Sequence, residues 1–159
     1  AKKIQFGTSP DPHACFLLER GIRTLHARMP IHASNAAILA ERLESHPAIE
    51  RVVHPSLPSH PDYEVAKQVM PNGTGMLGFV VKGGDNAAMS FMSRLKIIFE
   101  ATSLGGVESL IEVPATSSHM AVPEEVRIAA GISPGFVRMS VGIEDVEDIW
   151  NDIHQALGA

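Results

Sequence analysis

The chain has 159 residues, of which 45% are hydrophobic and 19% are charged, and its formal net charge is -5. A chain of this length buries roughly 70% of its unfolded surface, so it accommodates one domain with one core and no second full domain. The 13 basic residues are scattered rather than clustered. This distribution argues against nucleic acids and anionic membranes as partners.

The start of the chain and its single cysteine are informative about cellular location and domain context. The sequence has no apolar run of about 18 residues and no secretory leader at its start, so we expect a cytoplasmic protein and no membrane span. The opening Ala1 to Phe6 has neither an initiator methionine nor a helix cap, which favours a chain that starts within a longer one. Cys15 lies in an apolar run and is expected to be a buried, inert thiol.

The first half predicts a long helix that is extended or broken, over residues 11–45. Asp11 and Pro12 supply an N-cap and a first-turn proline, and apolar residues follow at helical spacing as one buried stripe. Pro30 is expected to kink or interrupt this helix. Such a helix can bridge two domains.

The next segments alternate between strands and helices. Strands are expected at residues 51–54, 76–81, 96–99 and 136–141, and helices at 62–69, 85–95 and 123–130, with a last helix on the stripe Val146, Ile149, Trp150, Ile153 and Leu157. Asp152 is placed outside that stripe, and His54 is expected to be a solvated loop residue. The order predicts an α+β fold with a small, mostly antiparallel sheet covered by helices.

Arg138 is the most informative residue of the strand expected at 136–141. Val137 and Met139 point to one face, so Arg138 points to the other. An arginine within a short alternating strand needs a carboxylate partner, a ligand or a solvated edge. A structural ion pair and a ligand contact are favoured about equally by the residues alone.

Other candidate sites are weak by pattern. The eight histidines show no metal-binding spacing, so no metal site is expected. The run Ser103-Leu104-Gly105-Gly106 matches neither a dinucleotide fingerprint nor a P-loop, and Ser103 lacks the elbow of a serine hydrolase. By pattern alone this run is a turn.

Four segments together resemble the Cys/Met metabolism family of pyridoxal-phosphate (PLP) enzymes, which includes cystathionine γ-synthase, cystathionine γ-lyase and methionine γ-lyase. They are Asp11-Pro12-His13-Ala14 with 20–25, Asn35-Ala36 with 43–47, residues 103–111 with Pro114-Ala115 and His119, and residues 137–145 with Asp148 and Asp152. The resemblance covers nearly the whole chain and is specific to the family's C-terminal domain, of fold type I.

The resemblance implies that Arg138 grips the α-carboxylate of the substrate, with Ser103 and the Leu104 backbone beside it. Thr102 stands where members that handle cystathionine often carry a glutamate, so the resemblance does not define the contact to the distal amine or the exact substrate. No lysine has the family's Ser-x-Thr/Ser-Lys context, so no catalytic residue is expected in this chain. PLP would be bound by an N-terminal domain that is missing from the chain.

The resemblance therefore predicts the C-terminal domain, residues 1–159, of a C–S lyase or synthase of sulfur amino-acid metabolism, acting by β- or γ-elimination or replacement. The expected partners are a sulfur-containing amino acid, the enzyme's own N-terminal domain, and further copies in a homotetramer. The chain alone is expected to be inactive. The alternative is a non-catalytic α+β module for small-carboxylate binding or assembly.

Overall fold

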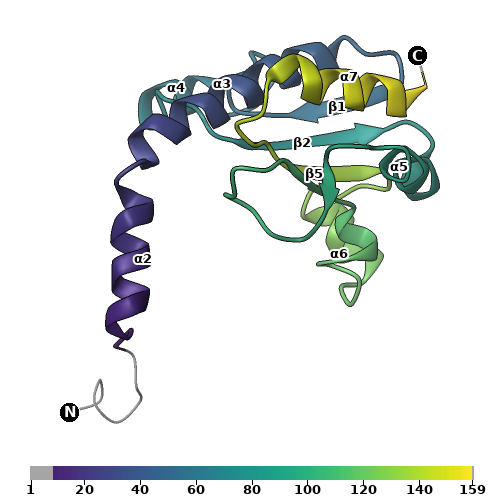
Figure 1. The fold of residues 1–159 in the computed structure, drawn as a ribbon. Coiled ribbons are helices and arrows are strands. Elements are labelled where there is room, and N and C mark those ends of the chain that lie inside the picture. Colours follow the sequence, from purple (N-terminus) through teal and green to yellow (C-terminus); the bar gives the residue numbers. More distant parts are fainter. Residues whose placement is uncertain (1–8, 159) are drawn as a thin grey trace.

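The computed structural model describes residues 9–158 (Figure 1). Five strands form one sheet in the order β1-β2-β5-β4-β3, and its pairs are antiparallel except β3–β4. The strands are β1 (Ile49–Val53), β2 (Met76–Val81), β3 (Phe99–Glu100), β4 (Leu110–Glu112) and β5 (Phe136–Ser140). The helices are α2 (Pro12–Ile22), α3 (Leu25–Glu44), α4 (Tyr63–Val69), α5 (Gly84–Met92), α6 (Glu124–Ala129) and α7 (Val146–Leu157), with a 3-10 turn η1 (Pro114–Thr116). The expected α+β fold is confirmed.

The core lies between one face of the sheet and the helices α3, α5 and α7. Figure 1 shows α3 and α7 lying along this face, with α6 on the opposite side of the sheet. In β5, Val137 and Met139 are fully buried in this core, whereas Arg138 belongs to the other face. The predicted alternation of β5 is therefore confirmed, and it leaves Arg138 free for other contacts.

The N-terminal helix is broken, but the predicted position of the break is wrong. Asp11 caps α2 as expected, with its carboxylate accepting from His13 N at 2.9 Å. The interruption falls at residues 23–24, and α3 runs through Pro30 without ending. Arg28 Nη2 donates to the carbonyl of Gly21 at 3.1 Å, which satisfies an acceptor at the end of α2.

Helix α2 lies outside the core, which contradicts the predicted buried stripe. It projects from the sheet and its covering helices (Figure 1), and none of its residues is buried. Cys15 is accordingly exposed rather than buried. The large apolar side chains of α2, which we call the α2 apolar residues, are also exposed: Phe16, Leu17, Leu18 and Ile22. Within residues 9–158 the chain does not cover them.

One buried carboxylate explains two further differences from prediction. Asp152 of α7 is only 5% exposed, and its carboxylate accepts from the backbone N–H groups of Lys96, Ile97 and Ile98 at 2.9–3.2 Å. The expected solvent-facing position of Asp152 is therefore wrong. Because these N–H groups bond to a side chain rather than to a strand, the predicted strand at 96–99 shrinks to Phe99–Glu100.

Strand β4 has no counterpart among the predicted elements. It is three residues long and ends in Glu112, which is 1% exposed. A buried glutamate is uncommon in a strand, because a carboxylate loses its hydration there and needs partners. Strand β4 becomes recognisable only through the pairing that places Glu112 opposite Arg138.

His54, expected in solvent, is fully buried at the end of β1. Its Nε2 lies 3.2 Å from the carbonyl of Thr74, and its Nδ1 lies 2.7 Å from Ser56 Oγ. Since a carbonyl only accepts, Nε2 carries the hydrogen and Nδ1 accepts from Ser56, which describes a neutral ring. Burial lowers the pKa of His54, while the bond to Thr74 acts in the opposite direction and nearby His60 lowers the pKa further.

The lowered pKa of His54 predicts that the fold is less stable in acid. The unfolded chain binds a proton at His54 near the ordinary pKa of about 6.5, whereas the folded chain resists it, so stability is complete above that pH and falls below it. One such group changes the free energy of unfolding by at most about 1.4 kcal/mol per pH unit. Urea unfolding between pH 8 and 5 measures this slope, and His54→Gln should reduce it. His13→Gln, which changes an exposed histidine of α2, is the control for the loss of one histidine. An equal slope in the His54 variant contradicts the assignment.

Candidate functional site

The site is centred on Arg138, in the middle strand of the sheet. Arg138 lies opposite Gly78 of β2 on one side and Glu112 of β4 on the other. Its Nη2 is 2.9 Å from Glu112 Oε1 and donates to the carbonyl oxygen of Thr102 at 2.6 Å. The Arg138 side chain is 29% exposed, and within residues 9–158 its Nε and Nη1 have no hydrogen-bond partner.

The guanidinium group therefore serves a structural pair and still has donors for a ligand. An arginine has five N–H donors, and Nη2 donates to the Thr102 carbonyl and forms the ion pair with Glu112. The three on Nε and Nη1 are available to an anion that approaches from the open side. The two alternatives for Arg138, ion pair and ligand contact, are compatible in this geometry.

Glu112 is a component of the site that the sequence analysis does not single out. Its Oε2 accepts from Ser117 Oγ at 2.7 Å, and its Oε1 accepts from Ser118 Oγ at 3.1 Å in addition to the pair with Arg138. Both serines follow η1. A signal was present in the sequence, because Glu112 is the one charged residue in the otherwise apolar run 110–114.

The loop 101–109 forms the second wall of the site. Gly105 N donates to Ser140 Oγ at 3.0 Å, and Ile143 N donates to the carbonyl of Val107 at 2.9 Å. These bonds attach the loop to β5 and to the segment that follows it. Gly105 has a φ of +77°, a conformation that favours glycine in this turn.

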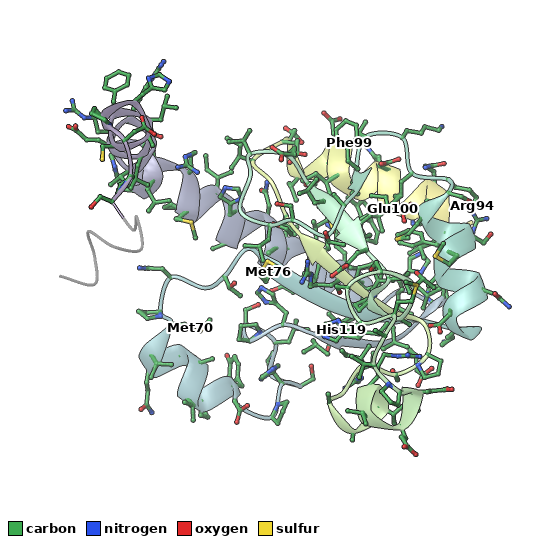
Figure 2. All side chains as sticks on the ribbon, turned by 90° about the horizontal axis from the view of Figure 1, so that it is seen from below. Met70, Met76, Arg94, Phe99, Glu100 and His119 are labelled. Carbon is green, nitrogen blue, oxygen red and sulfur yellow. The ribbon has the colours of Figure 1, made fainter. Side chains whose placement is uncertain are left out.

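The residues predicted for the site differ in whether they contact Arg138. Thr102 reaches Arg138 through its backbone carbonyl rather than its side chain. Ser103 and Leu104 follow in the same loop, with exposed side chains, and neither has a hydrogen bond to Arg138 within the described part of the chain. On the same side of the sheet, His119 lies toward α6 in the view from below (Figure 2). Its Nδ1 is 2.9 Å from Ser118 Oγ, next to Glu112.

Helix α3 supports the site from the opposite face of the sheet. Asn35 Nδ2 donates to the carbonyls of Gly142 and Glu144 at 3.2 and 2.9 Å, and His32 Nδ1 lies 2.7 Å from the Val141 carbonyl. Glu144 in turn accepts from Ser109 N at 2.6 Å. The end of β5 and the end of loop 101–109 are therefore held by one hydrogen-bonded network.

Gly142 is the tightest point of this network, and Gly142→Ala is expected to destabilise the chain by about 1–3 kcal/mol through overpacking. A Cβ there would collide with the Val107 carbonyl oxygen and lie 2.6 Å from the Glu108 carbonyl carbon, both backbone atoms that cannot rotate away. Thermal unfolding measures the change. The matched control is Gly21→Ala, because a Cβ at Gly21 meets nothing within 4 Å and α2 gains a better helix former. Equal melting temperatures for the two variants would refute the crowding at Gly142.

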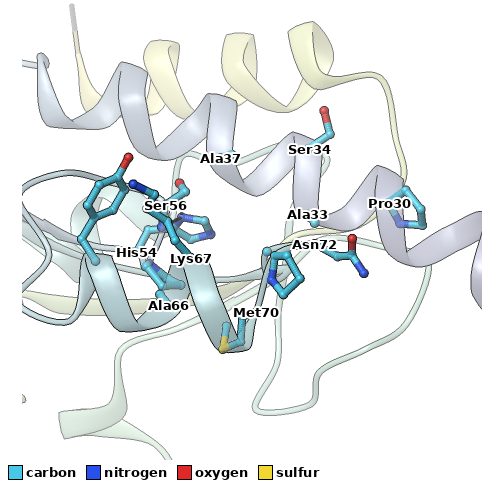
Figure 3. Close-up of a pocket in the computed structure, with 14 residues that line it drawn as sticks. Pro30, Ala33, Ser34, Ala37, His54, Ser56, Ala66, Lys67, Met70 and Asn72 are labelled. Carbon is cyan, nitrogen blue, oxygen red and sulfur yellow. Dashed lines mark hydrogen bonds between the residues drawn. The ribbon is translucent and has the colours of Figure 1, made fainter.

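A separate hollow of about 600 Å³ lies between α3, α4 and the segment after β1 (Figure 3). Its wall is mainly apolar, with His54, Ser56 and Lys67 among its polar residues. Neither Arg138 nor loop 101–109 lines it. Within residues 9–158 no group of three or more metal-ligating side chains occurs, and no helix has the length and apolarity to cross a bilayer.

Comparison with known proteins places the chain in a family. The family described as Cys/Met metabolism PLP-dependent enzyme matches the chain over residues 1–158. The chain belongs to this family. It is 49% identical to cystathionine gamma-lyase of Dictyostelium discoideum over 151 residues, which are 95% of the chain and 39% of that protein. It is 46% identical to cystathionine gamma-lyase of Macaca fascicularis and 45% identical to L-methionine gamma-lyase of Pseudomonas deceptionensis, each over 96% of the chain and 38% of the relative.

The Cys/Met metabolism family depends on PLP, and the lysines of residues 9–158 do not fit this cofactor. Lys67 is exposed and lies 3.4 Å from Glu64 and over the ring of Tyr63. Lys82 donates to the carbonyl of Pro47 at 2.6 Å, and Lys96 is exposed. None of these three lysines has a hydrogen bond or ion pair with Arg138 or loop 101–109 in the described part of the chain. Lys2 and Lys3 lie outside the described residues. The chain spans less than two fifths of the curated relatives named here.

Proposed function

We propose that this chain is the substrate-carboxylate-binding part of a PLP-dependent C–S lyase or synthase, whose cofactor is held by an N-terminal domain outside the chain. The observation that carries the proposal is the geometry of Arg138, which is fixed at Nη2 and has open donors on Nε and Nη1. A guanidinium group suits a carboxylate in charge and hydrogen-bonding geometry. Ser103 and the Leu104 backbone complete the carboxylate site.

The names of the relatives support the substrate class. They are cystathionine gamma-lyase and L-methionine gamma-lyase, so we infer a sulfur-containing amino acid such as cysteine, methionine or cystathionine. The reaction is β- or γ-elimination or replacement. Thr102 places a neutral residue beside the guanidinium group, and the distal end of the substrate lies near this residue.

The role of Arg138 in that reaction is positional. When the substrate carboxylate is fixed, the Cα–H bond beside it has a single orientation relative to the groups that remove the proton. The substrate loses its translational and rotational freedom on binding, so the loss no longer adds to the barrier of the chemical step, and the rate rises. The chain's contribution is therefore to bind and orient the substrate, and the chain by itself is inactive.

Exposed apolar side chains support the proposal that this chain packs against another domain or another subunit in the intact enzyme. The α2 apolar residues are uncovered, and Leu104 and Val107 of the loop that borders Arg138 are 57% and 49% exposed. Exposed apolar side chains that gather on one element are typical of interaction sites. We infer that α2 and α3 bridge to the cofactor domain, and that further contacts join the subunits of a cytoplasmic homotetramer.

The test uses the full-length enzyme that contains this chain. It is assayed for PLP-dependent release of a thiol from cystathionine and methionine and of sulfide from cysteine, with the enzyme freed of PLP as control. We expect activity on at least one of them and none without the cofactor. Turnover of none of these sulfur amino acids, by a folded enzyme that contains PLP, would contradict the proposal.

A further inference from the structure

We propose that Glu112 is the positioning residue for Arg138, and that Ser117 and Ser118 fix Glu112 for this task. The inference rests on the proposed function of Arg138 and deepens it. In this reading the carboxylate of Glu112 touches no substrate. It sets the orientation of the guanidinium group before the substrate arrives.

The burial of Glu112 is the first argument. A carboxylate that is 1% exposed loses nearly all of its hydration, and replacement of a buried ion pair by apolar residues is often neutral or stabilising. Fold stability alone therefore gives little reason for a charged pair in the middle of this sheet. A role in the orientation of Arg138 gives one.

The contacts of Glu112 are the second argument. Both carboxylate oxygens are held, Oε2 by Ser117 Oγ at 2.7 Å and Oε1 by Ser118 Oγ at 3.1 Å, so the carboxylate cannot turn freely. Oε1 then meets Arg138 Nη2 at 2.9 Å. The carbonyl of Thr102 holds the same nitrogen from loop 101–109, at 2.6 Å. Two elements thus fix one edge of the guanidinium group.

The consequence concerns the free edge of the group. An arginine side chain has several rotamers, so an unsupported Arg138 could bind the substrate carboxylate in more than one orientation. The pair with Glu112 orders the side chain beforehand. Functional groups that neighbouring side chains lock in this way hold a more accurate geometry.

Glu112→Gln separates charge from shape, because glutamine occupies the same volume and keeps an acceptor for Arg138. Its NH₂ group can face Ser117, whose hydroxyl also lies 2.7 Å from the Val113 carbonyl and can donate there. In the full-length enzyme we expect kcat to fall about 10-fold, since a small displacement of a bound substrate reduces rate strongly. We expect KM to change by less than about three-fold, because Arg138 still attracts the carboxylate.

A second readout is independent of turnover. L-Norleucine has the shape of methionine without a C–S bond, so its binding can be measured by calorimetry. Its Kd should stay within about three-fold in Glu112→Gln and rise more than about 10-fold in Arg138→Ala. A fall in kcat with little change in Kd identifies a positioning residue. A residue that only supports the fold would lower stability and leave both kcat and Kd unchanged.

The matched control is Asp152→Asn, which alters another buried carboxylate, on α7 along the opposite face of the sheet from Arg138 and held by backbone N–H groups instead. It should lower the melting temperature and leave kcat per bound PLP unchanged. If Glu112→Gln does not fold, Ser117→Ala serves instead, with a smaller loss of kcat in the same direction. A kcat within two-fold of wild type in the Glu112 variant, or an equal loss in the Asp152 control, would overturn the inference. Unchanged kcat/KM in Arg138→Ala would overturn the proposed function itself.

Discussion

Replacement of Arg138 by alanine is expected to lower kcat/KM of the full-length enzyme by about 30-fold to several thousand-fold, which corresponds to about 2–5 kcal/mol. The substrate carboxylate loses its guanidinium partner in this variant. Glu112 also loses its cation while it stays buried, so part of the effect is the cost of an unpaired charge. Steady-state kinetics with the preferred sulfur amino acid measure the change.

Two further variants distinguish carboxylate binding from support of the fold. Arg138→Lys keeps the charge beside Glu112 but offers a point charge in place of the planar fork, so it should retain the fold and lose most of the catalytic efficiency. Arg51→Ala is the control, because Arg51 is an exposed arginine of β1 whose Nη2 donates to the Gly131 carbonyl. It should preserve kcat/KM. Equal kinetics for wild type and Arg138→Ala would exclude Arg138 as the carboxylate anchor.

Replacement of Asp152 by alanine is expected to reduce the free energy of unfolding by about 3 kcal/mol or more. Three backbone N–H groups, those of Lys96, Ile97 and Ile98, lose a charged acceptor at once. Each buried N–H group left without a partner costs about 1–3 kcal/mol, and water entering the vacated space offsets part of the sum. Urea unfolding followed by the fluorescence of Trp150, the single tryptophan, measures the loss.

The control for Asp152 lies on the same helix. Asp148 is an exposed acidic residue in the first turn of α7, where its charge interacts favourably with the helix dipole. Asp148→Ala should change the free energy of unfolding by less than about 1 kcal/mol. If Asp152→Ala were as mild as this variant, the capping role of Asp152 would be refuted.

Elements with a regular pattern could be predicted from the sequence, because their pattern is set by local geometry. Strand β2 matches its predicted bounds, and α7 buries the predicted Ile149 and Ile153. The alternation in β5 placed Arg138 on the face away from the core. A repeat of 2 or 3.6 residues depends only on the local backbone geometry and not on distant contacts, so these features can be predicted from a single sequence.

The sequence by itself thus determined the fold class, the family and the face on which Arg138 lies. Only the tertiary structure decided which polar groups are buried: Asp152 against the 96–98 backbone, His54 against Thr74, and Glu112 against Arg138. A polar side chain enters a core only when partners from other elements satisfy its hydrogen bonds. Those partners lie 20 to 56 residues away in these three cases. For the same reason the site could be anticipated at Arg138 but not at Glu112, because Glu112 becomes part of it only when β4 pairs with β5.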